Sequence, residues 1–291
     1  MKAPAFKYHA PRSVAEAVAL MGSLDNARVL AGGQSLMPMM NLRVAAPDHL
    51  VDLGRIAELA RIEADDEGLW IGAMTSQRAV ERSDVVAQAC PLLAEAIAHV
   101  GHQQTRNRGT VGGSLCHLDP GAELPVVASA LDAELEIAGP GGLRRLKFHD
   151  FAADYLTSTL AADEILVRLR APRQTAREGS AFLEFNRRPA DFAIVSVATR
   201  LRLDGAGAIA SAAIAVGGAS FKPLRLGEIE AALVGKAPDE ATLAQAGEAA
   251  AATPCDGDEL YPADYRQDLL GTLVRRALTR AALRAGAQTH V

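Results

Sequence analysis

Two double-glycine segments constrain the fold of this 291-residue chain more than any other feature of its sequence. The first is Val29-Leu30-Ala31-Gly32-Gly33-Gln34-Ser35-Leu36-Met37-Pro38, and the second is Arg106-Asn107-Arg108-Gly109-Thr110-Val111-Gly112-Gly113-Ser114. Paired glycines let the backbone turn with positive φ and approach a ligand with no Cβ in the way. Successive N–H groups in such a turn form a nest that holds phosphate oxygens. Two such turns brought together by the fold predict a site for the two phosphates of a dinucleotide.

The residues around the glycines fit this interpretation but leave an alternative open. Neutral donors and two arginines flank the turns: Gln34, Ser35, Thr110, Ser114, Arg106 and Arg108. A Gly-Gly pair after a strand is also a common tight turn, and the spacing alone does not decide between the two interpretations. Neither segment matches GxGxxG or GxxxxGK[ST], so the sequence does not indicate a Rossmann or P-loop site.

The composition is that of an ordinary globular protein, and it excludes several classes of function. Hydrophobic residues make up 49% and charged residues 22%, and the net charge of −5 gives no indication of nucleic-acid binding. No apolar run approaches the roughly 20 residues of a membrane span, and the N-terminus lacks the apolar stretch of a signal peptide. Cys90, Cys116 and Cys255 form no CxxC pair, so we expect no iron–sulfur or zinc site on this chain and a cytoplasmic location.

Apolar periodicity predicts strands and helices in alternation, then a sheet followed by helices. Ser13 with Glu16 forms a capping box that opens a helix. Strands are predicted at 28–31, 50–53, 69–73 and 164–170, helices at 91–100 and 123–131, and a glycine-rich hairpin joins 133–137 to 143–148. After a polar stretch at 174–179, where we place the domain boundary, a hairpin joins 194–203 to 209–216. Helices follow at 224–233, 240–252 and 264–284.

Four segments, in order, resemble the FAD-binding medium subunit of molybdenum hydroxylases. They are Ala31-Gly32-Gly33-Gln34-Ser35 with Leu36-Met37-Pro38, then Arg106 to Ser114, then Asp119-Pro120-Gly121-Ala122-Glu123-Leu124-Pro125, and finally Arg187-Arg188-Pro189-Ala190-Asp191-Phe192-Ala193-Ile194-Val195. Aerobic carbon monoxide dehydrogenase, xanthine dehydrogenase and bacterial N-heterocycle dehydrogenases contain this module. The resemblance covers nearly the whole chain. Two residues depart from the pattern: Gln34 stands where several members have His, and Leu183 where some relatives carry Lys near the flavin.

The resemblance implies an α+β fold class. A PCMH-type FAD-binding domain of two α/β subdomains would be followed by a smaller C-terminal α+β domain, an antiparallel sheet plus helices. We expect the FAD-binding domain at residues 1–176, with subdomains of about 1–57 and 58–176. The C-terminal flavoprotein domain of the carbon monoxide dehydrogenase type would occupy residues 177–291.

The resemblance also implies which residues bind FAD, between the subdomains and with its pyrophosphate on the double-glycine segments. Glu123 matches an acidic family position that accepts hydrogen bonds from sugar or ribityl hydroxyls; its alternative role is a helix N-terminal acid favoured by the dipole. Ile165 and Phe192 match positions near the isoalloxazine ring, or are core residues, and Asp119 lines the flavin pocket or forms a turn. The predicted cofactor-binding set is Val29, Leu30, Ala31, Gly32, Gly33, Gln34, Ser35, Leu36, Thr110, Val111, Gly112, Gly113, Ser114, Asp119, Glu123, Ile165 and Phe192.

The implied activity is electron transfer within an oxidoreductase complex, with no catalytic acid or base and no metal ligand on this chain. The partners would be a large subunit with the molybdenum cofactor and a small subunit with [2Fe–2S] clusters, in a heterotrimer that dimerises. Electrons from the clusters would reach FAD and then an external acceptor. Two rival functions remain: a self-sufficient FAD-dependent oxidoreductase, and a non-enzymatic nucleotide-binding or assembly protein.

Overall fold

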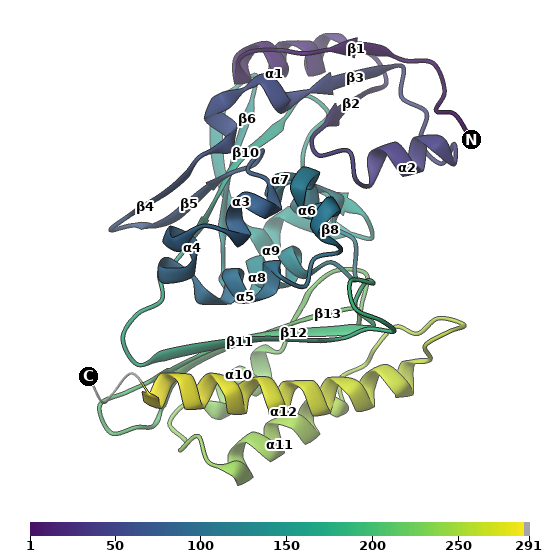
Figure 1. Cartoon of the computed structure of the whole chain (residues 1–291). Helices are drawn as coiled ribbons and strands as arrows, with labels where there is room; N and C mark the ends of the chain where they lie inside the picture. The colour runs from purple at the N-terminus through teal and green to yellow at the C-terminus, as the bar shows by residue number, and fades with distance from the viewer. Residues whose placement is uncertain (288–291) are drawn as a thin grey trace.

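The N-terminal lobe is built on a small parallel sheet. The structure, a computed structural model, describes residues 1–287 (Figure 1). The sheet has the order β1-β3-β2, and its elements are β1 (Lys7–His9), α1 (Val14–Ser23), β2 (Ala27–Leu30), α2 (Leu36–Asn41) and β3 (His49–Asp52). The Ser13 hydroxyl accepts a hydrogen bond from the Glu16 amide at 3.1 Å, and the Glu16 carboxylate accepts one from the Arg12 amide at 2.8 Å. The predicted capping pattern therefore does open α1.

The second lobe is an antiparallel sheet of order β4-β5-β10-β6-β7 with short helices packed on it. Its strands are β4 (Ile62–Asp65), β5 (Gly68–Gly72), β6 (Glu134–Gly139), β7 (Gly142–Lys147) and β10 (Ile165–Ala171), with the short pair β8 (Ala152–Asp154) and β9 (Thr157–Ser158) alongside. Its helices are α3 (Gln77–Glu81), α4 (Asp84–Ala89), α5 (Pro91–Ile97), α6 (Gln103–Arg108), α7 (Val111–His117), α8 (Glu123–Ala130) and α9 (Phe148–Phe151). The turns η1 (Leu53–Arg55) and η2 (Ala57–Ala60) connect the two lobes. The predicted β6–β7 hairpin forms, with Gly142 at φ 103°.

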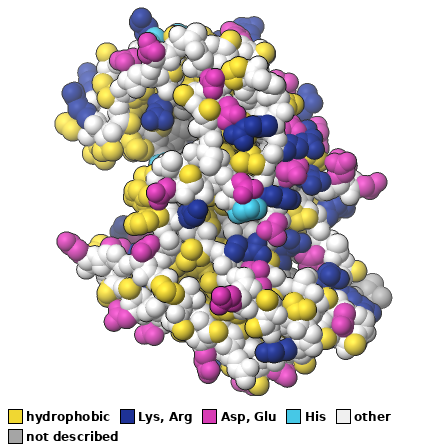
Figure 2. Space-filling model, turned by 180° about the vertical axis from the view of Figure 1, so that it is seen from behind, with side chains coloured by type: hydrophobic (Ala, Val, Ile, Leu, Met, Phe, Trp, Pro, Cys, Tyr) yellow, Lys and Arg dark blue, Asp and Glu magenta, His cyan; other side chains and the backbone are white. Residues whose placement is uncertain are grey.

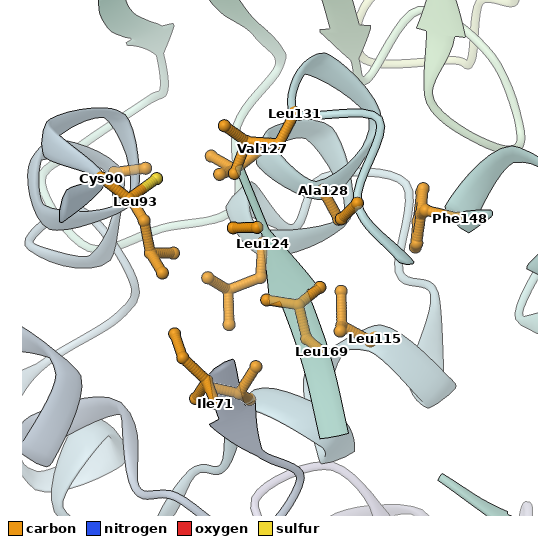
Figure 3. Close-up of a cluster of buried hydrophobic side chains, with 14 of the residues drawn as sticks. Ile71, Cys90, Leu93, Leu115, Leu124, Val127, Ala128, Leu131, Phe148 and Leu169 are labelled. Atoms are coloured by element: carbon orange, nitrogen blue, oxygen red, sulfur yellow. The ribbon is translucent and has the colours of Figure 1, made fainter. Parts of the chain in front are cut away.

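The core of this lobe lies between the sheet and helices α5, α7 and α8. Figure 3 shows Leu93, Leu115, Leu124 and Leu169 from these elements pointing toward one another. Cys90 belongs to the same buried cluster, and burial raises the pKa of its thiol to about 11. A neutral thiol in an apolar core acts as a small packing group, so we assign Cys90 no chemistry.

The C-terminal part is an antiparallel sheet covered on both faces. Its strands run in the order β11-β12-β13-β14, namely β11 (Glu178–Phe185), β12 (Val195–Leu203), β13 (Ile209–Gly217) and β14 (Leu224–Arg225). One face carries α10 (Gly227–Leu233) and the long α12 (Ala263–Ala287), and α11 (Glu240–Ala251) packs on α12 from outside (Figure 1). On the other face Phe182, Ala198 and Ala215 join the core of the second lobe. The sheet is therefore the shared middle layer that fixes the two parts of the chain together.

Two elements differ from the sequence prediction. Strand β11 was not predicted, because residues 174–179 are polar and residues 178–185 show no clean alternation. Its first five residues are all buried since the sheet is covered on both faces. The helix predicted at 224–233 begins only at Gly227, because Leu224 and Arg225 pair with Val216 and Ala215 at the sheet edge. Among the helices described, none is both long and apolar enough to cross a lipid bilayer.

Candidate functional site

The fold brings the two double-glycine segments into direct backbone contact. A Cβ added to Gly32 would lie 2.2 Å from the carbonyl oxygen of Arg108 and 2.8 Å from the Cα of Gly109. On the other side of the junction, a Cβ on Gly113 would lie 3.4 Å from the Cβ of Ala31. Real Cβ atoms do not approach backbone at 2.2 Å, so only glycine fits at position 32. The two segments, which come from different lobes, therefore lie side by side, as the sequence predicted.

The first segment presents a run of free donors. Within residues 1–287, the five backbone amides from Gly32 to Leu36 donate no hydrogen bond to the protein. The segment follows β2 and precedes α2, and Gly33 takes a left-handed φ of 72°. Successive amides in such a turn are the donor arrangement of an anion nest. Leu30, Ala31 and Leu36 are only half-buried although apolar, so this segment also offers a nonpolar surface.

The second segment is built differently from the prediction. Gly112 and Gly113 lie in the first turn of α7, and the helix α6 stands between the helix predicted at 91–100 and these glycines. Neither glycine has a positive φ. Gly112 is required by close packing, because a Cβ there would lie 2.5 Å from the Cβ of Ala73.

The amides of the second segment are already used inside the protein. Val111 donates to the Thr75 carbonyl at 3.0 Å and Gly112 to the Ala73 carbonyl at 2.8 Å. Gly113 donates to the Thr110 hydroxyl, which caps α7, at 3.1 Å. The expectation of a nest therefore fits the first segment alone. In place of free backbone amides, the second segment offers a ligand the Ser114 hydroxyl and a surface of closely packed glycines.

Arg106 is a structural residue and not a free positive charge at the site. Its guanidinium donates to both carboxylate oxygens of Glu81, at 2.9 and 3.0 Å, and to the carbonyls of Val100 and Gly101, at 2.9 and 2.8 Å. This clamp ties α6 to α3 just before Gly109. The contribution predicted for Arg106 is thus indirect, through the position of the second segment. Arg108 remains exposed.

We expect Glu81→Gln to lower the free energy of unfolding at pH 7 by about 2 kcal/mol, because a half-buried guanidinium loses its charged partner. Hydrogen bonds from Arg106, and from Arg78 at 2.8 Å, lower the pKa of Glu81 from 4.5 to about 2. Because the folded-state pKa is the lower one, this stabilisation exists above pH 4.5 and is lost as the pH falls toward about 2. Thermal unfolding across this pH range measures both effects.

Glu63→Gln is the matched control, because Glu63 and its partner Arg61 are 3.9 Å apart and their side chains are 59% and 67% exposed. An exposed pair of this kind contributes at most about 1 kcal/mol. Equal effects of the two substitutions would show that the Glu81–Arg106 clamp does not stabilise the fold.

The segment after α7 lies against the C-terminal part of the chain. The Asp119 carboxylate accepts a hydrogen bond from the Gly121 amide at 2.9 Å, which is the turn-forming role. A Cβ on Gly121 would lie 3.1 Å from the Cβ of Phe192, so the predicted residues 119–123 and 192 are neighbours. Phe192 is 63% exposed, as a residue available to a ligand or partner should be.

Ile165 is placed differently from the other predicted residues. It is 2% exposed and packs in the apolar cluster that joins the first two lobes, with Val18 and Val51. Its observed role is packing, which was the alternative interpretation of this position.

Glu123 begins α8 and is 4% exposed. Burial raises the pKa of its carboxyl to about 8, and the nearby charges of Glu184 and Asp119 raise it further, while its own backbone amide and His99 oppose the shift. Glu184 lies on β11 and accepts hydrogen bonds at one oxygen, Oε1, from Asn186 at 2.8 Å and from the His99 ring at 3.2 Å. Its other oxygen, Oε2, is buried without a partner.

Three residues whose backbones pair with the second segment were not identified from the sequence. The Gln77 amide donates to the Gly109 carbonyl at 2.8 Å, Ser76 pairs with Thr110, and Thr75 accepts from Val111. The Gln77 side chain is 5% exposed, and its oxygen has no partner. No signal in the sequence marks this pairing, since it joins a turn after β5 to a segment far along the chain.

Figure 2 shows the molecule hollowed beneath its N-terminal lobe, with apolar side chains gathered on the rim of the hollow. Among residues 1–287, no three His, Cys, Asp or Glu side chains come together in a way that suits a metal ion.

The double-glycine junction, the parallel N-terminal sheet and the covered C-terminal sheet together define a class of flavoproteins. The chain belongs to the family described as FAD binding domain in molybdopterin dehydrogenase, matched over residues 4–174, and residues 180–281 match the CO dehydrogenase flavoprotein C-terminal domain. The predicted family, fold class and cofactor, FAD, are thereby confirmed.

Particular relatives match over nearly their full length. The chain is 37% identical to the 6-hydroxypseudooxynicotine dehydrogenase complex subunit alpha of Paenarthrobacter nicotinovorans, over 98% of this chain and 97% of the relative. It is 37% identical to the carbon monoxide dehydrogenase medium chain of Hydrogenophaga pseudoflava, over 96% and 97%. The solved carbon monoxide dehydrogenase from that organism, in a form lacking the Mo-pyranopterin moiety, superposes with a TM-score of 0.94 at 39% identity over 98% of this chain and 99% of that one.

Proposed function

We propose that this chain is the FAD-binding electron-transfer subunit of a molybdenum hydroxylase complex. The observation that carries the proposal is the contact of Gly32 with Arg108 and Gly109, which places five free amides beside the second double-glycine segment. The relatives named as a medium chain and as a complex subunit support the same assignment.

The residues at the junction fit FAD. The amides of Gly32 to Leu36 can donate to pyrophosphate oxygens, and the hydroxyl of Ser114 adds a donor on the facing segment. The half-buried Leu30, Ala31 and Leu36 offer a nonpolar wall to the planar parts of the cofactor. Glu123, Asp119 and Phe192 would form the second half of the pocket, where α8 meets the C-terminal sheet. Ile165 would support this wall from the core.

The chain itself binds and orients, and a bound FAD supplies the exchange of electrons between a partner's iron–sulfur clusters and an external acceptor. We propose that residues 1–176 form the FAD-binding domain and residues 177–291 the C-terminal domain. We also propose a large molybdenum subunit and a small [2Fe–2S] subunit as partners, in a dimer of heterotrimers located in the cytoplasm. The ranges of the two matched families support the domain bounds, and the names of the relatives, a complex subunit and a medium chain, support partner subunits.

The test is to co-express the chain with its two candidate partner subunits and to purify it by a tag on this chain alone. The proposal predicts that both partners are retained, and that acid releases FAD in a ratio close to one per chain. A colourless chain that takes up no added FAD in the presence of both partners would contradict the proposal. FAD without retained partners would instead favour a self-sufficient flavoprotein.

A further inference from the structure

Two segments of the proposed cofactor pocket meet at one end of the C-terminal sheet. Phe192 lies just before β12, and residues 119–123 lead into α8. The amides of Ala193 and Gly218 donate to carbonyls of residues 119–123, at 3.3 and 2.8 Å. The position of this pocket wall therefore depends on what holds the chain around Ala193 and Gly218.

Arg266, in the first turn of α12, holds both places. One nitrogen of its guanidinium, Nη1, donates to the Ile194 carbonyl at 3.1 Å and also to the Gly218 carbonyl. The two carbonyl residues are in direct contact, because a Cβ on Gly218 would lie 2.2 Å from the Ile194 carbonyl oxygen. Helix α12 covers the face of the sheet opposite the second lobe (Figure 1). Arg266 therefore connects the helix layer on one face of the sheet to the backbone at its end.

The guanidinium is itself held by the loop that leads into α12. Its Nη2 donates to the Asp258 carboxylate at 2.5 Å, and its Nε donates to the Tyr261 carbonyl at 3.3 Å. The guanidinium carbon also lies 5.9 Å from the centre of the Tyr261 ring, and the side chain is only 13% exposed. All three nitrogens are engaged at once, which requires the planar fork of an arginine and which a single ammonium group does not provide.

The charge of Arg266 does not stabilise α12 itself. A cation in the first turn of a helix is opposed by the helix dipole. The packing of α12 on the sheet uses apolar residues such as Leu270 and Val274, which are fully buried. The hydrogen bonds of Arg266 instead fix loop backbone, at Ile194 and Gly218. The role that these contacts define is the placement of the chain that carries Phe192.

We propose that Arg266 is a positioning residue for FAD, which fixes Phe192 against the bound cofactor through the carbonyl of Ile194. In this role the guanidinium acts through the backbone of residues 192–194 and not by contact with the cofactor. This inference rests on the proposed function and deepens it, because it adds a residue from outside the pocket to those that would bind FAD directly.

The test is the affinity for FAD and the visible circular dichroism of bound FAD, in the purified complex after the cofactor has been removed and added back. The dichroism reports how firmly the surroundings of the flavin are fixed. Arg266→Gln should weaken the affinity about ten-fold, as expected for a residue that acts on a ligand without contact, and should reduce the dichroism at saturating FAD. Arg276→Gln, at an exposed site on the same helix, should change neither quantity. Unchanged affinity and dichroism in Arg266→Gln would overturn the inference.

A double-mutant cycle separates positioning from a general effect on the fold. If Arg266 acts through Phe192, then Arg266→Gln in a Phe192→Ala background should weaken FAD binding by only about two-fold or less. A loss as large as in the wild-type background would show that Arg266 does not act through Phe192, and would contradict the positioning role.

Arg266→Lys provides a second variant if Arg266→Gln does not fold. It keeps a positive charge beside Asp258, but one nitrogen cannot occupy the three positions that the guanidinium nitrogens fill. The dichroism of bound FAD should therefore still be reduced, and wild-type affinity and dichroism in Arg266→Lys would contradict the inference. A wild-type complex that binds no FAD would instead contradict the proposed function itself.

Discussion

Gly32→Ala is expected to abolish FAD binding. The new Cβ would lie 2.2 Å from the Arg108 carbonyl oxygen and 2.8 Å from the Arg108 carbonyl carbon. Both are backbone atoms held by α6 and its clamp to Glu81, so the clash is relieved only by separating the two segments. The amides of Gly32 to Leu36 would then no longer lie beside the second segment. The flavin content of the purified protein measures the effect, and we expect at least a hundred-fold loss of affinity, about 3 kcal/mol.

Gly141→Ala is the matched control in the same domain. Gly141 lies in the β6–β7 turn, and a Cβ there would have no neighbour within 4 Å. This variant should retain the flavin content and melting temperature of the wild type. Normal FAD binding by Gly32→Ala would show that the contact between the segments is not required for the site.

Gly179→Ala is expected to destabilise the C-terminal part strongly. A Cβ on Gly179 would lie 1.9 Å from the Ala281 carbonyl oxygen and 2.5 Å from the Ala285 amide nitrogen. Strand β11 and helix α12 would have to move apart along the interface that joins them. Overpacking of this kind costs about 3 kcal/mol, and we expect the melting temperature to fall by roughly 6–12 °C.

Gly227→Ala is the control for this second prediction. Gly227 begins α10, and a Cβ there would meet no atom within 4 Å. Its melting temperature should stay within about 1 °C of the wild type. If Gly179→Ala melts at the same temperature as Gly227→Ala, the packing of β11 on α12 is looser than the structure implies.

Local signals in the sequence were sufficient to predict many of the elements. Ser13 with Glu16 marked the start of α1, the glycines at 139–142 marked the β6–β7 hairpin, and apolar spacing marked α11 and α12. These elements form for reasons contained in a few neighbouring residues, which is why periodicity and turn chemistry could identify them.

The features missed from the sequence depend on contacts between distant segments. Strand β11 is covered on both faces, so it lacks the alternation that identifies a strand with one exposed face. Gly112 and Gly113 were predicted in a turn with positive φ, but they lie in the first turn of α7, which Thr110 caps, and Gly112 packs against Ala73 from a distant segment. The partner of Arg106 is on α3, and no local pattern connects these two residues.

The proximity of the two double-glycine segments was predicted from the sequence, but the hydrogen bonding of their amides was not. The contact between Gly32 and the second segment follows from the expectation that both segments meet one ligand. Which amides remain free to donate depends on hydrogen-bond partners that only the folded chain determines.

Hydrogen exchange of individual amides, with and without FAD, tests the central claim most directly. If the pyrophosphate binds the first double-glycine segment, the amides of Gly32 to Leu36 should exchange quickly without FAD and become protected when it is added. The amides of Val111, Gly112 and Gly113 already donate within the protein, so their protection should change little. Added FAD that binds but leaves the amides of Gly32 to Leu36 unprotected would contradict this account of the site.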